Sequence, residues 1–214
     1  MSDSDYPLDD VQNYDEEAEA IGWIGPELAF AMIWPQLSPG QRVLDIGVGT
    51  GLAAAQFHKA GLKVHGMDLS EKMLEISSGK GVLVDAKKHD LTVAPYPYDE
   101  GSMDHAVCVG TLNFFEDLST VFNEVGRVLR PEGCFAFITG HREEDGDAVF
   151  SVGPEHTRSG ASVTMYLHSE AQVRAWLEAA GLRQTQTMEF KVPMDKERKW
   201  VLPARATMAR KEPA

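Results

Sequence analysis

The chain has few cysteines and no long apolar segment. Its two cysteines, Cys108 and Cys134, lie in apolar strand-like segments, so we expect reduced core residues and no disulfide. No uninterrupted apolar segment approaches the roughly 20 residues that cross a bilayer, and nothing resembles a signal peptide. These absences predict a cytoplasmic protein without a membrane partner.

Basic residues are also scarce. Twenty lysines and arginines stand against 33 aspartates and glutamates, which gives a formal net charge of −13. An acidic surface opposes binding to nucleic acid and to anionic membranes. Eight of the acids lie in residues 1–20, which contain no basic residue. We therefore predict that residues 1–13 form a flexible acidic segment.

The size and patterning of the chain indicate one domain. With 214 residues, 43% of them hydrophobic, we expect a single unit over 1–214 that begins with a helical cap over 14–39. Strand and helix patterns then alternate over 41–139, which predicts a mostly parallel sheet with helices on both faces. Strand patterns at 182–192 and 204–209 flank a proline-bounded loop too short for a crossover helix, so the last strand should run antiparallel.

One segment carries most of the functional information. It reads Val43-Leu44-Asp45-Ile46-Gly47-Val48-Gly49-Thr50-Gly51. An apolar strand ends in an acid and continues into three glycines, which let a ligand approach bare backbone before the next helix. A second strand-like segment, 62–67, is followed by Asp68. Two strand-end acids beside a glycine turn indicate a nucleoside site in which a carboxylate binds ribose hydroxyls.

Three ligand classes compete for this turn. A phosphate-binding P-loop does not fit, because no glycine here is followed by Lys and then Ser or Thr. A dinucleotide fingerprint is tolerable when read from Gly49 through Gly51 to Ala54, so the turn alone leaves a nicotinamide cofactor open. Asp45 shifts the balance, because a carboxylate there repels a pyrophosphate but accepts hydrogen bonds from an ammonium group.

The same segment resembles the first motif of the class I S-adenosylmethionine-dependent methyltransferases. Further segments resemble later motifs of that family in the expected order: His89-Asp90-Leu91, Gly101-Ser102-Met103-Asp104 with Val107 to Gly110, and Leu129-Arg130-Pro131-Glu132-Gly133. The resemblance covers roughly residues 40–140. It implies an α/β, Rossmann-like methyltransferase fold: a doubly wound, seven-stranded, mostly parallel sheet with an antiparallel last strand. It also implies S-adenosyl-L-methionine as cofactor and S-adenosyl-L-homocysteine as product.

The resemblance assigns cofactor contacts residue by residue. It places the methionine portion over the glycine turn, the ribose hydroxyls on Asp68 and the adenine amine on Asp90. Tyr14 resembles a tyrosine that many relatives fold over the cofactor. The expected cofactor-binding residues are Asp45, Gly47, Gly49, Gly51, Asp68, Leu69, Asp90, Leu91, Gly110 and Tyr14. We assign no metal site.

Residues 140–168 form the least ordinary region, a long connection between the fifth strand and the last helix. Part of it, 162–167, alternates enough to be a strand. Because loops beyond strand ends carry specificity, we expect a substrate-site insertion here. His141 is the first candidate for a general base, followed by Tyr166 and His168. A base is needed only when the acceptor must lose a proton.

Absent motifs narrow the acceptor. The segment after the fourth strand, Gly110 to Asn113, lacks the Asp/Asn-Pro-Pro-Tyr of adenine and glutamine methyltransferases, and no Pro-Cys nucleophile serves cytosine. With the acidic surface, this favours methyl transfer to a small molecule by in-line displacement. A non-catalytic S-adenosylmethionine-binding protein and, less strongly, a nicotinamide-dependent oxidoreductase remain as alternatives. The oligomeric state is not assigned.

Overall fold

The computed structural model describes residues 13–152, 162–195 and 197–213. The predicted acidic segment, 1–13, lies outside these residues apart from Asn13. The helices are α1 (Tyr14–Ile21), α2 (Gly25–Ile33), α3 (Leu52–Lys59), α4 (Glu71–Gly79), α5 (Ser119–Val128) and α6 (Glu170–Ala179), with short 3-10 turns at Trp34–Gln36 and Leu112–Phe114. The strands are β1 (Arg42–Ile46), β2 (Lys63–Asp68), β3 (Asp85–Lys88), β4 (Met103–Cys108), β5 (Leu129–His141), β6 (Val149–Val152), β7 (Val163–His168), β8 (Leu182–Pro193) and β9 (Val201–Lys211).

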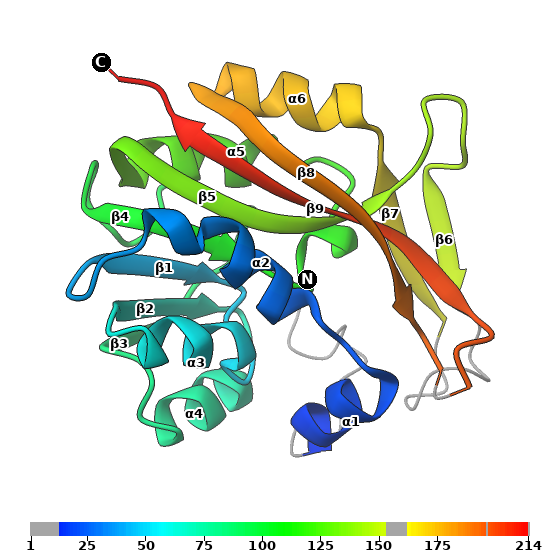
Figure 1. Ribbon diagram of the computed structural model, residues 1–214, viewed down its shortest axis with the longest axis horizontal. Coiled ribbons are helices and arrows are strands. Elements are labelled where there is room, and N and C mark those ends of the chain that lie inside the picture. The colour runs from blue at the N-terminus through cyan, green and yellow to red at the C-terminus, as the bar shows by residue number, and fades with distance from the viewer. Residues whose placement is uncertain (1–12, 153–161, 196, 214) are drawn as a thin grey trace.

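The sheet has the predicted topology. Its strands β3-β2-β1-β4-β5 are hydrogen-bonded in this order and run parallel (Figure 1). β9 runs antiparallel to β5 and to β8, which confirms the prediction of an antiparallel last strand. The described residues form nine strands instead of the predicted seven, because β6 and β7 add an antiparallel hairpin. β7 joins the sheet through Gly140 and His141 at the end of β5.

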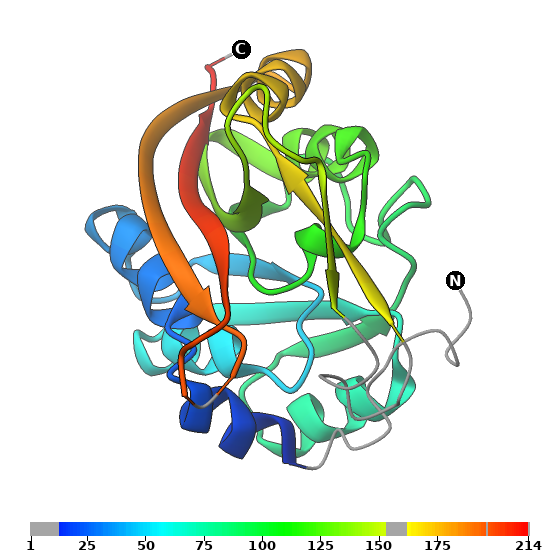
Figure 2. The ribbon, with the colours of Figure 1, turned by 90° about the vertical axis from the view of Figure 1, so that its right-hand side faces the viewer.

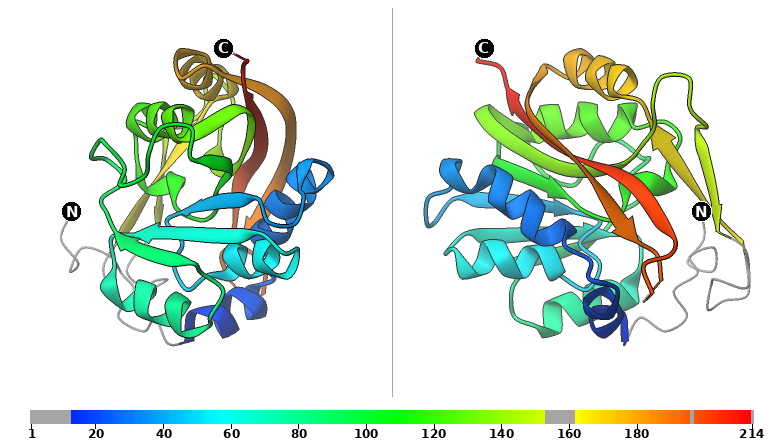
Figure 3. Two further views of the ribbon diagram at one scale, coloured as in Figure 1. Left: turned by 90° about the vertical axis from the view of Figure 1, so that its left-hand side faces the viewer. Right: turned by 45° about the vertical axis from the view of Figure 1, so that its right-hand side comes forward.

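Different helices cover the two faces of the sheet (Figures 1 and 3). On one face, α5 and α6 bury the aromatic residues of β5, where Phe122 packs on Phe137 at a centroid distance of 5.0 Å. On the other face, α2 and α3 bury Val43 together with Phe57. The alternation of strand side chains between faces explains both cores, since successive strand residues point to opposite sides. Because β1, β2 and β4 run parallel, their carboxyl ends lie at the same edge of the sheet.

Two helices begin at serine caps. The Ser70 hydroxyl accepts a hydrogen bond from the Met73 amide, which starts α4 directly after β2. Ser169 and Gln172 form a complete capping box at the start of α6. Among the described residues, no helix is both long and apolar enough to span a membrane. The cytoplasmic location stays a prediction.

A partly buried ion pair fixes the loop that follows β3. Arg127 and Glu124, both in α5, lie 2.6 Å apart, and the Glu124 carboxylate also accepts a hydrogen bond from the Tyr96 amide at 2.6 Å. Arg127 donates to the carbonyl of Tyr98 at 2.9 Å, and the Tyr98 hydroxyl donates to the carbonyl of Gly66 in β2. The pair thereby holds the proline-rich loop against the sheet.

Arg127→Ala should lower the free energy of unfolding by about 1–2 kcal/mol, because the Glu124 carboxylate loses its partner and stays buried. Arg174→Ala is the matched control, since Arg174 pairs with Glu170 on an exposed helix surface and should cost at most about 0.5 kcal/mol. Urea unfolding of the two variants tests the difference. Equal losses would show that the Arg127 pair contributes no more than a surface pair.

Candidate cofactor site

A cavity of about 450 Å³ opens at the carboxyl ends of β1, β2 and β4. Its lining includes these predicted cofactor residues: Tyr14, Asp45, Gly47, Gly49, Asp68, Leu69, Asp90, Leu91 and Gly110. Gly51 is not in the lining; it caps the start of α3 with a φ of 88°. The fold thus brings the predicted residues together at one sheet edge, as expected for parallel strands. Their individual contacts with a cofactor stay a prediction.

The glycine turn is closed on one side and open on the other. A Cβ atom on Gly47 would lie 2.4 Å from the Thr111 hydroxyl, so only glycine fits there, at a φ of 68°. A Cβ atom on Gly49 would meet nothing within 4 Å. The turn therefore packs against the segment after β4 at Gly47 and leaves open space for a ligand beside Gly49.

Asp68 also has a structural role, because its carboxylate binds two backbone amides. One carboxylate oxygen accepts a hydrogen bond from the Gly49 amide and the other from the Ser70 amide, both at 2.9 Å. The end of β2 is thereby tied to the glycine turn and to the cap of α4. The short spacing of Asp68 and Ser70 before a helix is the signal that points to the second contact, because aspartate readily bonds the amide two residues on.

Asp45 is a buried carboxylate with a free acceptor. Its side chain is 1% exposed, and its Oδ2 atom has no hydrogen-bond partner among the described residues. Burial raises the pKa of Asp45 to about 7; the charge of Asp68 adds to this, and a hydrogen bond from the Ala54 amide opposes it. A buried acceptor without a partner is costly, so its place in the cavity wall points to a cationic ligand group.

The side of the cavity that contains Asp90 is built differently. Asp90 accepts hydrogen bonds from the Thr92 amide at 2.9 Å and from the Thr92 hydroxyl at 2.7 Å. Burial raises the pKa of Asp90, but these hydrogen bonds outweigh it and hold the pKa below its ordinary value. Leu91 is buried beside it. An ionised acceptor next to an apolar surface suits a flat base that carries an amine.

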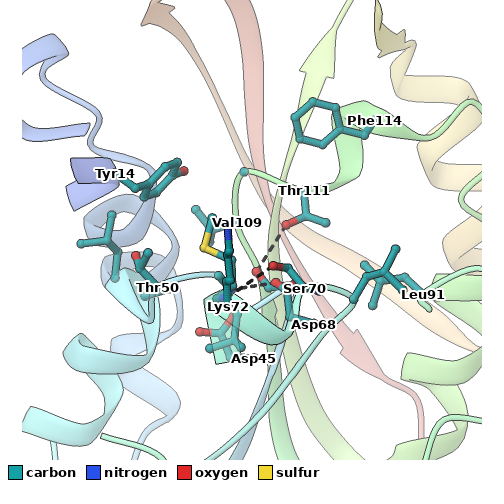
Figure 4. Close-up of a pocket in the computed structure, with 18 of the residues that line it drawn as sticks. Tyr14, Asp45, Thr50, Asp68, Ser70, Lys72, Leu91, Val109, Thr111 and Phe114 are labelled. Atoms are coloured by element: carbon teal, nitrogen blue, oxygen red, sulfur yellow. Dashed lines mark hydrogen bonds between the residues drawn. The ribbon is translucent and has the colours of Figure 1, made fainter. Parts of the chain in front are cut away.

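Helix α1 lies over the cavity, and Asp15 attaches it to the glycine turn. The Thr50 hydroxyl in the glycine turn donates to Asp15 at 2.6 Å, and Asp15 also forms an ion pair with Lys80 at the end of α4. Tyr14 and Thr50 lie at the same side of the cavity in Figure 4. Burial raises the pKa of the Tyr14 hydroxyl, with smaller contributions from the charges of Asp15 and Asp68.

Asp15→Ala should weaken binding of S-adenosylhomocysteine by about fivefold, because α1 loses its attachment to the turn at a cost of about 1 kcal/mol. Glu16→Ala removes the same charge from the exposed side of α1 and should leave the affinity unchanged. Calorimetric titration of both variants makes the comparison. Equal weakening in the two would mean that charge, and not the Asp15 contacts, affects the site.

The three candidate catalytic residues do not line the cavity. His141 is buried at the end of β5, with its Nε2 atom 3.3 Å from Arg205 and 3.5 Å from Glu189. The Nε2 atom of His168 bonds to the carbonyl of Phe115 at 3.0 Å, and burial lowers the pKa of this ring. Tyr166 pairs with Val149 in the β6–β7 hairpin. Their catalytic role stays a prediction.

Several lining residues have no signal in the sequence patterns. Phe114 and Phe115 follow β4 and line the cavity, and the sequence alone does not decide whether such residues belong to the core or to the site. Trp23, Pro26 and Lys72 were not expected there at all. In Figure 4, Phe114 and Tyr14 lie at the end of the cavity away from Asp45. Aromatic residues thus form one end of the cavity and acids the other.

The fold and site together define a class of protein. A parallel sheet with one reversed strand between β5 and β8, a glycine turn after β1, and acids near the ends of β1, β2 and β3 are the features of the Rossmann-like methyltransferases. Residues 44–137 match the family described as "Methyltransferase domain". Over these residues the chain is therefore similar to the class I S-adenosylmethionine-dependent methyltransferases. The cofactor of that class is S-adenosylmethionine, with S-adenosylhomocysteine as the product.

Named relatives and solved structures agree with this class. The chain is 29% identical over 154 residues to the ubiquinone biosynthesis O-methyltransferase of Ralstonia nicotianae, covering 70% of this chain and 63% of that one. It is 32% identical to phosphoethanolamine N-methyltransferase 2 of Caenorhabditis elegans, covering 56% and 26%. A putative methyltransferase of Haloferax volcanii, solved in complex with the Trm112 methyltransferase activator, has a TM-score of 0.74 at 20% identity over 97% of both chains. The chain thus spans only part of the length of its curated relatives.

Proposed function

We propose that this protein transfers a methyl group from S-adenosylmethionine to a small-molecule acceptor by in-line displacement. The single observation that carries the proposal is the unpartnered Oδ2 atom of Asp45, buried in the wall of a cavity that also contains Asp68 and Asp90. A buried carboxylate needs a cation, and the ammonium group of a methionine moiety supplies one.

The residues present fit this cofactor. Asp45 would accept from its ammonium group, Asp68 from its ribose hydroxyls and Asp90 from its adenine amine. The open space at Gly49 leaves room for the ligand beside the turn. When bound, S-adenosylmethionine supplies a methyl group whose carbon–sulfur bond breaks as the acceptor's lone pair bonds to the carbon, leaving S-adenosylhomocysteine and releasing the acceptor's proton. Tyr14 and Phe114 would exclude water and align the acceptor.

The acceptor is proposed to be a small molecule, and charge supports this. A net charge of −13 opposes the phosphate contacts that dominate nucleic-acid binding. The names of the Ralstonia and Caenorhabditis relatives also refer to small molecules, ubiquinone precursors and phosphoethanolamine. Neither name identifies the acceptor here, because the chain covers less than two thirds of either relative.

Calorimetry distinguishes the proposal from its alternatives. We expect S-adenosylhomocysteine to bind at one site per chain and NAD not to bind. Purified protein should then release S-adenosylhomocysteine from S-adenosylmethionine only when an acceptor is present. Binding of NAD without S-adenosylhomocysteine would indicate an oxidoreductase. Cofactor binding without turnover over a broad acceptor panel would indicate a binding protein.

The candidate bases are tested in the same assay. For His141 to act as a base, its ring must reach the cavity, away from Arg205 and Glu189. Loss of turnover in His141→Ala, with unchanged affinity for S-adenosylhomocysteine, would keep it as a catalytic residue. Retained turnover would exclude His141 as a catalytic residue. Tyr166→Phe and His168→Gln extend the test to the other two candidates.

A further inference from the structure

One end of the cavity is formed by rings without charge. Its acids lie at the glycine turn and near the ends of β2 and β3, whereas Figure 4 shows Tyr14 and Phe114 at the other end. The uncharged lining residues contributed by α1, the start of α2 and the segments after β4 are Tyr14, Trp23, Pro26, Val109, Phe114 and Phe115. Rings of this kind favour flat partners, which they contact by stacking or by edge-to-face packing.

This aromatic end continues into an apolar wall. Trp23 and Val109, both in the cavity lining, also pack against a hydrophobic cluster at the ends of β5, β7, β8 and β9. Trp23 stacks on Phe190 of β8 at a centroid distance of 6.4 Å. The other partly buried members of the cluster near the strand ends are Phe150, Met165 and Met194.

The wall lies at the ends of two hairpins, β6–β7 and β8–β9. Figures 1 and 2 show that the β6–β7 and β8–β9 hairpins project toward the end of the molecule that carries α1. Phe190 and Met194 come from β8 and the turn after it, whereas Phe150 and Met165 come from the β6–β7 hairpin. Methionines and partly buried rings form an adaptable surface for apolar groups. Apolar side chains of this kind favour apolar groups over a phosphate or an ammonium group.

We propose that the methyl acceptor is an uncharged molecule with a planar ring and an apolar extension. The ring that bears the nucleophile lies between Tyr14 and Phe114, and the extension lies along the wall that begins at Trp23 and Phe190. This inference rests on the proposed methyltransferase function and deepens it, because it names the substrate class. It sets aside small charged amines as acceptors.

A series of 4-alkylphenols tests the inference by direct binding. Protein saturated with S-adenosylhomocysteine is titrated calorimetrically with 4-methylphenol, 4-propylphenol and 4-pentylphenol, and with ethanolamine phosphate as the charged probe. Each added methylene should raise the affinity about threefold, since burial of one methylene contributes about 0.8 kcal/mol at most. Ethanolamine phosphate should bind at least tenfold more weakly than 4-pentylphenol. Affinity that does not change with chain length would overturn the apolar wall.

Two variants locate the extension. Phe190→Ala should flatten the dependence on chain length while the affinity for S-adenosylhomocysteine stays unchanged, and Phe190→Leu should restore most of it. Phe30→Ala is the matched control, because Phe30 is a partly buried ring that contacts Trp34 and Phe57 on the same sheet face. The control should keep the full dependence. The same loss in Phe30→Ala would show a general effect of destabilisation and overturn the assignment of the wall.

The two proposals fail in different ways. Tight binding and methylation of ethanolamine phosphate, with weak phenol binding, would overturn the substrate class and leave the methyltransferase function standing. Failure to bind S-adenosylhomocysteine at all would overturn the proposed function. Methyl transfer to 4-pentylphenol, measured as release of S-adenosylhomocysteine, would support both.

Discussion

Asp45→Asn should make the protein more stable at pH 8 and a much weaker binder of its cofactor. At this pH the native Asp45 side chain is ionised although it is buried, because its pKa is raised from 3.8 to about 7. A shift of about three units corresponds to a cost of about 4 kcal/mol. Asparagine removes the charge but leaves a buried amide donor, which costs about 1–3 kcal/mol. The net gain in unfolding free energy should be about 2 kcal/mol.

The sign of this effect depends on pH. Between about pH 4 and pH 7 the folded protein holds a proton on Asp45 that the unfolded chain has released, so this group lowers stability as pH rises and has no further effect above pH 7. The advantage of Asp45→Asn should therefore grow by about 4 kcal/mol from pH 4 to pH 8. Comparing both proteins at each pH cancels other groups, such as His105, whose pKa burial lowers to about 4.

Cofactor binding should show the opposite dependence. The ammonium group of the ligand needs an ionised Asp45, so below about pH 7 each bound molecule must displace a proton. The affinity of the native protein for S-adenosylhomocysteine should fall about tenfold per pH unit below that value. The affinity of Asp45→Asn should be weak and nearly independent of pH from 5 to 7. Urea unfolding and calorimetry give both profiles, and parallel profiles for the two proteins would exclude Asp45 as the titrating group.

The sheet was predictable where each strand has its own local signal. Val43 to Ile46 is apolar and ends in a glycine turn, so strand and turn identify each other. Residues 162–167 alternate, and β7 is there. β6 reads Val-Phe-Ser-Val, but four residues are too few for an alternation to stand out, and the strand is completed by pairing with β7. The segment Pro131-Glu132-Gly133 has residues typical of a turn, but it lies within β5 as an irregularity, with a φ of 66° at Glu132.

The residues of the candidate site also differ in whether a local sequence signal predicts them. The acids and glycines follow directly from strand ends, whereas Trp23 and Phe114 lie far apart in the sequence and meet only through tertiary packing. The placement of His141 depends on strand alternation. It shares a face of β5 with Phe135 and Phe137, which pack beneath α5, and this face carries its side chain toward Arg205. A prediction made from its position in a loop could not include that constraint, because β5 extends as far as His141.

Asp68→Ala should weaken binding of S-adenosylhomocysteine by about 3 kcal/mol, or roughly 150-fold. A lost ribose hydrogen bond accounts for about 1–3 kcal/mol of such an effect. The structure places the total at the upper end, because the same carboxylate holds the Gly49 and Ser70 amides at 2.9 Å and so fixes the open part of the glycine turn. Asp68→Asn keeps acceptor oxygen for one of these contacts and should lose less.

A control variant tests whether the loss of one negative charge alone weakens binding. Asp99 is exposed and does not line the cavity, so Asp99→Ala removes an equal charge and should leave the affinity unchanged. Circular dichroism and urea unfolding must show that Asp68→Ala is folded, since its two backbone contacts also contribute to stability. A folded Asp68→Ala protein with native affinity would remove this residue from the ribose site. Because Asp68 supports the turn in the absence of ligand, its loss should also slow association, whereas loss of a ligand contact alone should act on dissociation. Stopped-flow binding rates therefore decide whether Asp68 acts mainly by preparing the turn or by holding the ribose.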